Sequence, residues 1–496
     1  MGLFRFLASA DDHMPPEAFA NAYLAGMEGI PWRSTNRRTP SENGMSEYVL
    51  ERSIGESGNL YIPWRIEGHG ELMLSTASLM ERDSPYHLSL ELARGVLNRL
   101  RSQLFDWEMA GLVTPDALKE AVATASSTFI EAVIALPDSE RVVASANEAI
   151  RQSLDAGEAL CAEYTRQALA VRHQSSEQLP TLLGCTLSSR ELSEGEQDSC
   201  AESFNTTAVS FKWRDVEQTA GKHEWDAFDQ QIDWCHANGM RVIGGPLLQL
   251  DTAHIPDWIY LWEDDFDQIQ AYIAQYIRAT ASRYRGRVHV WHCAARMNVT
   301  GAISLNEEQR LRLVVSSVDE LRRNDPQAAI LLSFDQPWAE YLATNERDLS
   351  PLHLADLLVR ADLGIAGVGV ELNIGYSPGG SFPRTPLEYS RQLDRWSALD
   401  LPLVVFLSAP SERSETSNAQ RAVGNTENAW TPEGQAELAD RLVPLILAKP
   451  YVQGIVWNQL ADTEQHEFAH GGLLDAQSVA KPALQRLSLI RQQHLT

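Results

Sequence analysis

Apolar residues follow two different periodicities in the first third of the chain. Between residues 1 and 82, short apolar runs are separated by Gly, Pro and Ser, and Leu60, Ile62 and Trp64 give a partial alternation with a period of two. This pattern is typical of half-buried strands and predicts a small β-rich, sandwich-like domain. Between residues 83 and 176, apolar residues recur at spacings of three and four, which predicts a helical connecting region.

After residue 180, short apolar runs alternate with longer amphipathic stretches up to about residue 490. The runs predict strands, and the stretches predict the helices between them. We place the strands at residues 181–187, 204–212, 241–248, 288–294, 329–334, 365–372, 402–408 and 452–458. Strand–helix units in this order indicate an α/β fold, a (β/α)8 TIM barrel that follows the β-rich domain and the helical region. A doubly wound open sheet is the alternative arrangement.

Composition narrows the range of partners. A chain of 496 residues suits a barrel with an accessory region, and the formal net charge of -26 argues against nucleic acid or an anionic membrane as a partner, because both require a cationic face. The five cysteines are scattered without a C-x-x-C pair, so we expect neither a disulfide framework nor a zinc site. No segment has the length and apolarity of a membrane span, and the N-terminus makes a poor secretory signal, so the cytoplasm is the default expectation.

Four segments carry a resemblance to a known family. The sequence FKWRDVEQTAGKHEWDAFDQQIDWCHANGMRVIGG, at residues 211–245, resembles the second and third strand units of the family 10 glycoside hydrolases, the endo-1,4-β-xylanase family. IAGVGVELNIGY at 365–376, GIVWNQLAD at 454–462 and LLDAQSVAKPAL at 473–484 resemble later parts of the same barrel. The resemblance covers about residues 180–490 and implies a barrel that binds or hydrolyses a polysaccharide or oligosaccharide.

The resemblance breaks down at the positions that carry the chemistry. Retaining glycosidases use two carboxyl groups about 5 Å apart, one as acid/base and one as nucleophile. The resemblance implies glutamates at the ends of the fourth and seventh strands, where this chain has Arg296 and Leu407. An arginine side chain cannot give up a proton at any working pH. Because residues 288–298 and 402–411 contain no Asp or Glu, we do not expect the conventional retaining mechanism.

Carboxylates do occur at the ends of two other predicted strands. Asp335 follows the fifth strand and Glu371 ends the sixth, so the two could form a relocated catalytic pair if one of them has a raised pKa. The alternative is that Glu371 forms a structural ion pair with Arg296 across the barrel mouth.

Residues near the other strand ends are candidates for contacts with a sugar. Lys212 and Trp213 match a sugar-contacting position of the family, although a core tryptophan beside an extended lysine explains them equally well. The predicted substrate-binding residues are Lys212, Trp213, Arg296, Asn298, Trp338, Asn373, Tyr376, Trp457, Asn458 and Asp462. Asp462 could instead orient a loop, and the aromatic residues could belong to the core.

Three hypotheses for function follow from these residues. The first is a carbohydrate-binding barrel that does not hydrolyse its ligand, and the second is an active glycoside hydrolase that uses Asp335 and Glu371. The third is a non-catalytic scaffold or interaction protein. His466, Glu467 and His470 are metal-ligand types, but their spacing is not H-E-x-x-H, so we expect no metal and no other cofactor. The sequence leaves the oligomeric state open.

Overall fold

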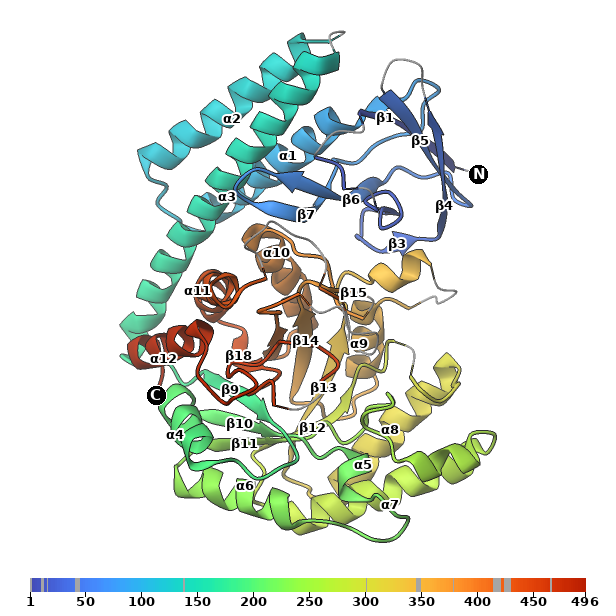
Figure 1. Ribbon diagram of the computed structural model, residues 1–496, viewed down its shortest axis with the longest axis vertical. Coiled ribbons are helices and arrows are strands. Elements are labelled where there is room, and N and C mark those ends of the chain that lie inside the picture. The colour runs from blue at the N-terminus through green and yellow to red at the C-terminus, as the bar shows by residue number, and fades with distance from the viewer. Residues whose placement is uncertain are drawn as a thin grey trace.

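The molecule consists of an N-terminal β-rich part, a helical region and a barrel (Figure 1). The computed structural model describes residues 2–9, 13–15, 17–40, 45–136, 139–299, 301–344, 349–377, 379–413, 421–422, 430–463 and 466–496. In Figure 1 the N-terminal part lies above the barrel, and the helical region runs along one side of both. The fold class predicted from the sequence is confirmed.

The N-terminal part contains two four-stranded sheets, with strand orders β4-β5-β1-β8 and β3-β2-β6-β7. Apolar side chains of both sheets share one buried cluster, in which Phe6 and Leu50 come from the first sheet and Ile62 and Trp64 from the second. The strands are β1 (Gly2–Ser9), β2 (Tyr23–Ala25), β3 (Pro31–Trp32), β4 (Ser34–Pro40), β5 (Met45–Arg52), β6 (Asn59–Ile66), β7 (Gly70–Ser75) and β8 (Tyr86–His87).

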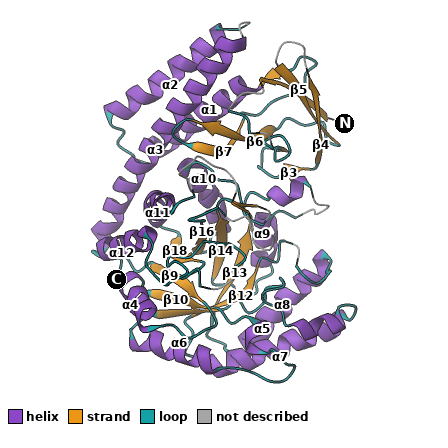
Figure 2. Ribbon diagram, in the orientation of Figure 1, coloured by secondary structure: helices purple, strands orange, loops and turns teal. Residues whose placement is uncertain are grey.

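Three long helices form the connecting region: α1 (Leu88–Met109), α2 (Asp116–Ile134) and α3 (Ser139–Ser175). Their apolar faces pack on one another, as the spacing of three and four predicts, and α1 and α3 also cover the N-terminal sheets. The helix α3 extends from the N-terminal part to the C-terminal helix of the barrel, where the ring nitrogens of His173 and His494 lie 2.9 Å apart (Figures 1 and 2).

Eight parallel strands close the barrel in the order β9-β10-β11-β12-β13-β14-β16-β18. All eight predicted strands are present, at β9 (Leu182–Leu187), β10 (Thr206–Val209), β11 (Arg241–Gly244), β12 (Val290–Ala295), β13 (Ala329–Asp335), β14 (Gly367–Asn373), β16 (Leu403–Ser408) and β18 (Val452–Trp457). The third is shorter than the predicted 241–248 because Gly245 turns the chain at a φ of 125° and Pro246 has no N–H to donate.

Helices cover the outside of the barrel, as Figure 2 shows. The α-helices are α4 (Glu194–Ser203), α5 (Trp213–Val216), α6 (Asp226–Ala237), α7 (Phe266–Tyr284), α8 (Glu307–Asn324), α9 (Pro351–Arg360), α10 (Pro386–Trp396), α11 (Pro432–Leu447) and α12 (Pro482–His494). Short elements complete the chain: η1 (Asp257–Trp262), η2 (Glu340–Ala343), η3 (Ser397–Leu399), β15 (Tyr376–Ser377) and β17 (Arg421–Ala422).

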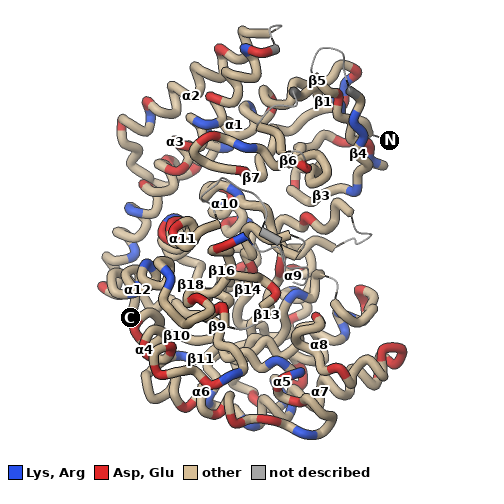
Figure 3. Tube along the Cα trace, viewed as in Figure 1, with Lys and Arg blue, Asp and Glu red and all other residues tan. Residues whose placement is uncertain are grey.

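The central strands of the barrel are buried on both faces. Every residue of β14 and of β16 is buried, which explains why these strands appear in the sequence as continuous apolar runs rather than as alternating patterns. Charged residues of both signs lie along the outer helices (Figure 3). In the part of the chain that the structure describes, no helix combines the length and apolarity that crossing a membrane requires.

Candidate functional site

Polar side chains gather where the barrel strands end. Arg296 directly follows β12, Asp335 is the last residue of β13, and Glu371 lies opposite Asp335 in the register of β14. Parallel barrel strands all end at the same face, where the loops after the strands form the usual functional site of this fold. Fold topology alone therefore brings these three charged groups together.

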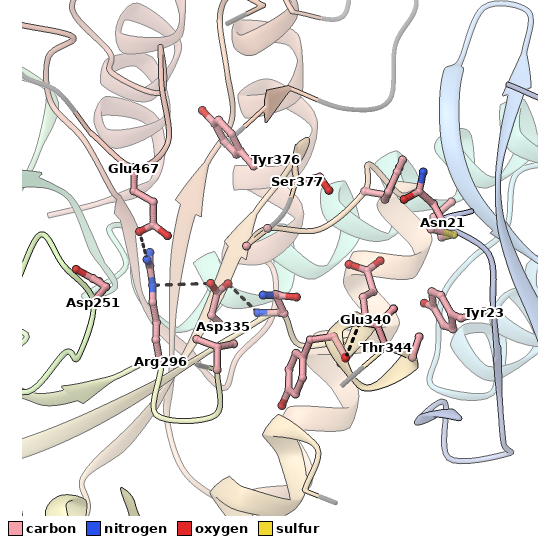
Figure 4. Close-up of a pocket in the computed structure, with 18 of the residues that line it drawn as sticks. Asn21, Tyr23, Asp251, Arg296, Asp335, Glu340, Thr344, Tyr376, Ser377 and Glu467 are labelled. Atoms are coloured by element: carbon pink, nitrogen blue, oxygen red, sulfur yellow. Dashed lines mark hydrogen bonds and ion pairs between the residues drawn. The ribbon is translucent and has the colours of Figure 1, made fainter. Parts of the chain in front are cut away.

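Arg296 lies between the acidic groups and contacts all of them. Its Nε donates a hydrogen bond of 2.6 Å to Glu371 Oε2 and lies 3.8 Å from Asp335 Oδ2, and its Nη1 donates to the carboxylate of Glu467. The guanidinium carbon lies 4.9 Å from the ring centre of Phe468. Figure 4 shows Arg296 between Glu467 and Asp335. The ion pair between Glu371 and Arg296 that the sequence suggested is confirmed.

Neutral side chains hold the two carboxyl groups in place. Asn373 Nδ2 donates to Asp335 Oδ1 at 2.9 Å and lies 3.5 Å from Glu371 Oε2. Ser333 Oγ donates to Glu371 Oε1 at 2.7 Å, and it lies 2.8 Å from Nε2 of His292. Because the serine uses its only proton on Glu371, the imidazole must be the donor in the second contact.

Asn298 and Asn458 extend this network, in different ways. The side chain of Asn298 forms two hydrogen bonds with the backbone of Asp335, donating to its carbonyl at 2.8 Å and accepting from its N–H at 3.1 Å. Asn458 Nδ2 donates to Asn373 Oδ1 at 3.0 Å and to Ser408 Oγ at 2.9 Å. Both asparagines therefore position the groups around the carboxyl pair.

Burial and hydrogen bonding move the pKa values of the two carboxyl groups in opposite directions. Burial raises the pKa of Asp335 to about 8, although Arg296 opposes the shift. The pKa of Glu371 is lowered, because the charge of Arg296 and the hydrogen bond from Ser333 outweigh its burial. The difference follows from distance, since Glu371 accepts a hydrogen bond from the guanidinium and Asp335 does not. At neutral pH the pair therefore holds one proton, on Asp335.

The position of that proton follows from the contacts of Asp335. Its Oδ1 accepts hydrogen bonds from the N–H of Gln336 at 2.7 Å and from Asn373. Two donors on Oδ1 leave Oδ2 to carry the proton. Asp335 lines a cavity of about 540 Å³, and its Oδ2 lies 3.8 Å from Arg296 Nε.

Two cavities meet at Arg296 and Glu467, which line both of them. The larger one, of about 540 Å³, lies between the barrel and the N-terminal part (Figure 4). The smaller one, of about 110 Å³, lies on the other side of Arg296 and is lined by Lys212, His292 and His466. Burial and the nearby cations lower the pKa of His292 to about 4 and that of His466 to about 3, so both imidazoles are neutral at pH 7.

The other predicted residues fall into two groups. Lys212, Asn458 and Tyr376 line one or other of the two cavities, whereas the tryptophans line neither. Trp213 stacks on Tyr276, and its indole N–H donates a hydrogen bond of 2.8 Å to Glu217. These contacts correspond to the alternative interpretation of Trp213 as a core residue.

The remaining two tryptophans are also packed. Trp338 is 6% exposed and lies under the guanidinium of Arg384, at 4.4 Å from carbon to ring centre. Trp457 is 2% exposed and donates to the carbonyl of Gly471 at 2.7 Å. Burial of this kind favours packing over stacking against a sugar ring.

Asp462 and the histidines of the last barrel loop have structural contacts. Asp462 Oδ2 accepts a hydrogen bond of 2.5 Å from Lys481 and its Oδ1 one of 2.7 Å from the N–H of Gly472, which fits its alternative role of orienting the loop. In the described ranges of the chain, no three His, Cys, Asp or Glu side chains are grouped as metal ligands would be.

Sequence reasoning missed several residues of the larger cavity. Asp251 and Glu340 come from loops that follow β11 and β13, and their position after a strand was the only available signal. Glu467 was weighed as a metal ligand, but its carboxylate pairs with Arg296. Asn21 and Asn36 belong to the N-terminal part, and nothing in the sequence connects them to the barrel mouth.

A closed barrel with carboxyl groups in a cavity at the ends of its strands has the site typical of barrels that bind or transform small polar molecules. Comparison with known proteins makes the class more specific. Residues 171–297 match the family model described as Glycosyl hydrolase family 10. The chain is therefore similar to the family 10 glycoside hydrolases over the part of the barrel that contains its first four strands.

Individual proteins and solved structures are also similar to this chain. Endo-1,4-beta-xylanase C of Paenibacillus barcinonensis is 33% identical over 96 residues, which cover 18% of this chain and only 9% of that protein. Xylanase 10B from Thermotoga maritima has a TM-score of 0.49 at 16% identity, covering 65% of this chain and 98% of that one. The GH10 structure from Paenibacillus barcinonensis has a TM-score of 0.48 at 17% identity, covering 66% and 98%.

Proposed function

We propose that this protein binds a neutral polysaccharide or oligosaccharide at the mouth of its barrel and does not hydrolyse it by the conventional retaining mechanism. The observation that carries the proposal is the position of Arg296, whose Nε lies 2.6 Å from Glu371 Oε2, in an ion pair, and 3.8 Å from Asp335 Oδ2. A retaining mechanism requires two carboxyl groups with free access to the scissile bond. Here one of the two is already neutralised by a cation.

The character of the cavity also supports a sugar ligand. A volume of about 540 Å³ lies within the range of roughly 300–1,000 Å³ that is usual for small-molecule sites. The protonated Asp335 supplies a donor, and Gln249 and Gln336 supply both donors and acceptors. Because the chain is similar to endo-1,4-beta-xylanase C over 96 residues, β-1,4-xylan and its oligosaccharides are the first ligands to test.

A second candidate function is hydrolysis by the relocated pair. Two carboxyl groups whose pKa values are driven apart are the usual arrangement for an acid and a base or nucleophile, and Asp335 and Glu371 have this property. For this function Arg296 would have to release Glu371 when the substrate binds.

One experiment separates the two candidates. Purified protein is incubated with xylan and with xylohexaose, binding is followed by calorimetry, and shorter products are sought by chromatography. The proposal expects saturable binding without products. Release of products that disappears in both Asp335→Asn and Glu371→Gln would instead establish the second candidate. A failure to bind either carbohydrate would contradict both.

A further inference from the structure

The larger cavity is bounded only in part by the barrel. Asn21, Tyr23, Ser34, Asn36 and Met73 line it from the N-terminal part, on β2, β4, β7 and the turn before β2. In Figure 4, Asn21 and Tyr23 lie across the cavity from Arg296, Asp335 and Glu467. One wall of the site therefore comes from residues 20–73 and the other from residues 249–467.

Buried contacts fix this wall to the barrel. The side chain of Arg384, which precedes α10, is fully buried, and it donates to Glu340 at 2.6 Å and to the hydroxyl of Tyr23 at 2.9 Å. The N–H of Met73 donates to the carbonyl of Pro383 at 2.8 Å. Tyr23 and Met73 also share a buried apolar cluster with a phenylalanine of the barrel, Phe382. The wall is thus a part of the folded molecule with specific contacts.

Most of the charged groups around the cavity pair within the protein, and Asp251, which also lines it, contacts His254 Nδ1 at 2.8 Å. Arg296 pairs with Glu371 and Glu467, and Glu340 pairs with Arg384. The uncharged polar groups of the lining are amides and hydroxyls, those of Asn21, Asn36, Ser34, Gln249, Gln336 and Thr344. Asn21 and Asn36 each donate one hydrogen bond of 3.0 Å to a backbone carbonyl, of Glu17 and Phe19, so the Oδ1 and the second amide hydrogen of each can serve a ligand. Such a lining suits an uncharged molecule rich in hydroxyl groups.

We propose that the N-terminal part closes one end of the barrel mouth and that the site binds the end of a carbohydrate chain or a short oligosaccharide. This inference rests on the proposed function. A site that binds the interior of a long polysaccharide must be open at both ends, so that the chain can continue on either side. Here the wall formed by Asn21, Tyr23 and Asn36 lies at one of these ends. The amides of Asn21 and Asn36 then determine specificity by contacting the terminal sugar.

The test compares ligand lengths and wall variants in the full-length protein. Xylobiose to xylohexaose and soluble xylan are titrated calorimetrically, and the xylan is used before and after partial acid hydrolysis. We expect the affinity to increase with oligosaccharide length only up to a short oligosaccharide. We also expect the number of binding sites per gram of xylan to increase after acid hydrolysis, because hydrolysis creates new chain ends. Asn21→Ala and Asn36→Ala should each weaken oligosaccharide binding about three- to tenfold, the effect of one lost neutral hydrogen bond.

A matched control is Asn59→Ala in the same part of the molecule. Asn59 donates to the carbonyl of Thr76 at 3.2 Å and does not line this cavity, so binding should be unchanged. Three results would overturn this inference alone. They are an affinity that keeps rising with oligosaccharide length, xylan binding that is proportional to xylan mass rather than to the number of chain ends, and wild-type affinity in both wall variants. Absence of binding to every carbohydrate would overturn the proposed function along with it.

Discussion

Arg296 stands between two buried carboxyl groups, and its charge allows Glu371 to remain ionised there. The residue holds a φ of 57°, in the left-handed region that side chains other than glycine rarely adopt. A strained backbone at a functional position is stable only when its surroundings hold it, and the contacts with Glu371 and Glu467 do so here. Arg296 is thus the electrostatic centre of the barrel mouth.

Removing this centre should destabilise the fold in a pH-dependent way. Arg296→Met leaves Glu371 buried without a partner, which costs about 3–5 kcal/mol of unfolding free energy. The loss should be larger at pH 8 than at pH 5, because protonation of the unpaired Glu371 removes the buried charge. Urea unfolding at both pH values measures it. The control is Arg278→Met, which removes an exposed partner of Glu320 and should leave the urea midpoint unchanged. Equal losses of unfolding free energy in the two variants would contradict the role of Arg296.

His292 should determine part of the acid sensitivity. Burial lowers the pKa of its imidazole to about 4, so below pH 6.5 the unfolded chain binds a proton that the folded chain refuses. Unfolding free energy therefore falls as the pH drops from 6.5 to 4, by up to about 1.4 kcal/mol per pH unit. His292→Gln keeps a donor for Ser333 and should flatten this slope. The measurement is urea unfolding of the wild type and the variant at pH 6.5, 5.5 and 4.5. The same dependence of unfolding free energy on pH in the two proteins would contradict this role of His292.

Individual residues of the site were predictable only where the strand register placed them. Asp335 and Glu371 could be found because both stand at the end of an apolar run, and the fold fixes where such residues meet. The tryptophans could not be resolved, because a core ring and an exposed sugar platform have the same neighbours in the sequence. Trp213 and Trp457 are buried at 4% and 2% exposure, a fact that depends on tertiary packing.

The long connection between β18 and α12 is the element that completes the site, since it carries Glu467 and Phe468. Lys481 holds this connection together from within. Its buried ammonium donates to Asp462 at 2.5 Å, to the carbonyl of Gly472 at 2.7 Å and to Ser411 Oγ at 2.8 Å. One lysine therefore positions a loop whose carboxylate neutralises Arg296.

Lys481→Met should loosen this connection specifically. The change leaves Asp462 buried and unpaired and should lower unfolding free energy by about 3–5 kcal/mol. Hydrogen exchange of the amides at 466–474 should accelerate. Lys449→Met is the matched control, because Lys449 is equally buried and pairs with Asp394 on α10. The control should lose less stability, because Asp394 is 39% exposed, and it should show no faster exchange at 466–474. The same exchange pattern in both variants would refute the role of Lys481.

The barrel elements were predictable for a definite reason. Strands buried on both faces, such as β13 and β16, appear as apolar runs with a polar residue only toward the end, and amphipathic stretches separate them. The loops followed no such pattern. The connection after β18 combines glycines, histidines and acidic residues, and its course depends on the contacts of Lys481 and Arg296 rather than on local preference.

The whole molecule depends on the docking of the N-terminal part against the barrel, through Arg384 above all. Arg384→Met removes the partner of Glu340 in the interface and should lower stability by about 3–5 kcal/mol. It should also increase the radius of gyration measured by small-angle X-ray scattering. The double variant Arg384→Met/Glu340→Gln should recover part of the stability, because no unpaired charge remains buried. An unchanged radius of gyration in the single variant would contradict this view of the interface.

The relation between these two parts was beyond the reach of the sequence. The periodicity of the first 82 residues predicted strands, and nothing in it indicated that Asn21 and Asn36 would face Asp335. Contacts of such long sequence separation depend on how surfaces fit after each part has folded. The presence of an N-terminal wall at the barrel mouth could therefore be found only from the structure.

Isothermal titration of the purified chain with xylohexaose tests the central claim most directly, because one experiment records both binding and turnover. The account predicts saturable heats that return to the baseline after each injection, because Arg296 neutralises Glu371 and leaves no free carboxyl pair. Continuous heat of turnover after an injection, accompanied by shorter xylo-oligosaccharides in the cell, would contradict it. So would the absence of any heat of binding across the accessible concentration range.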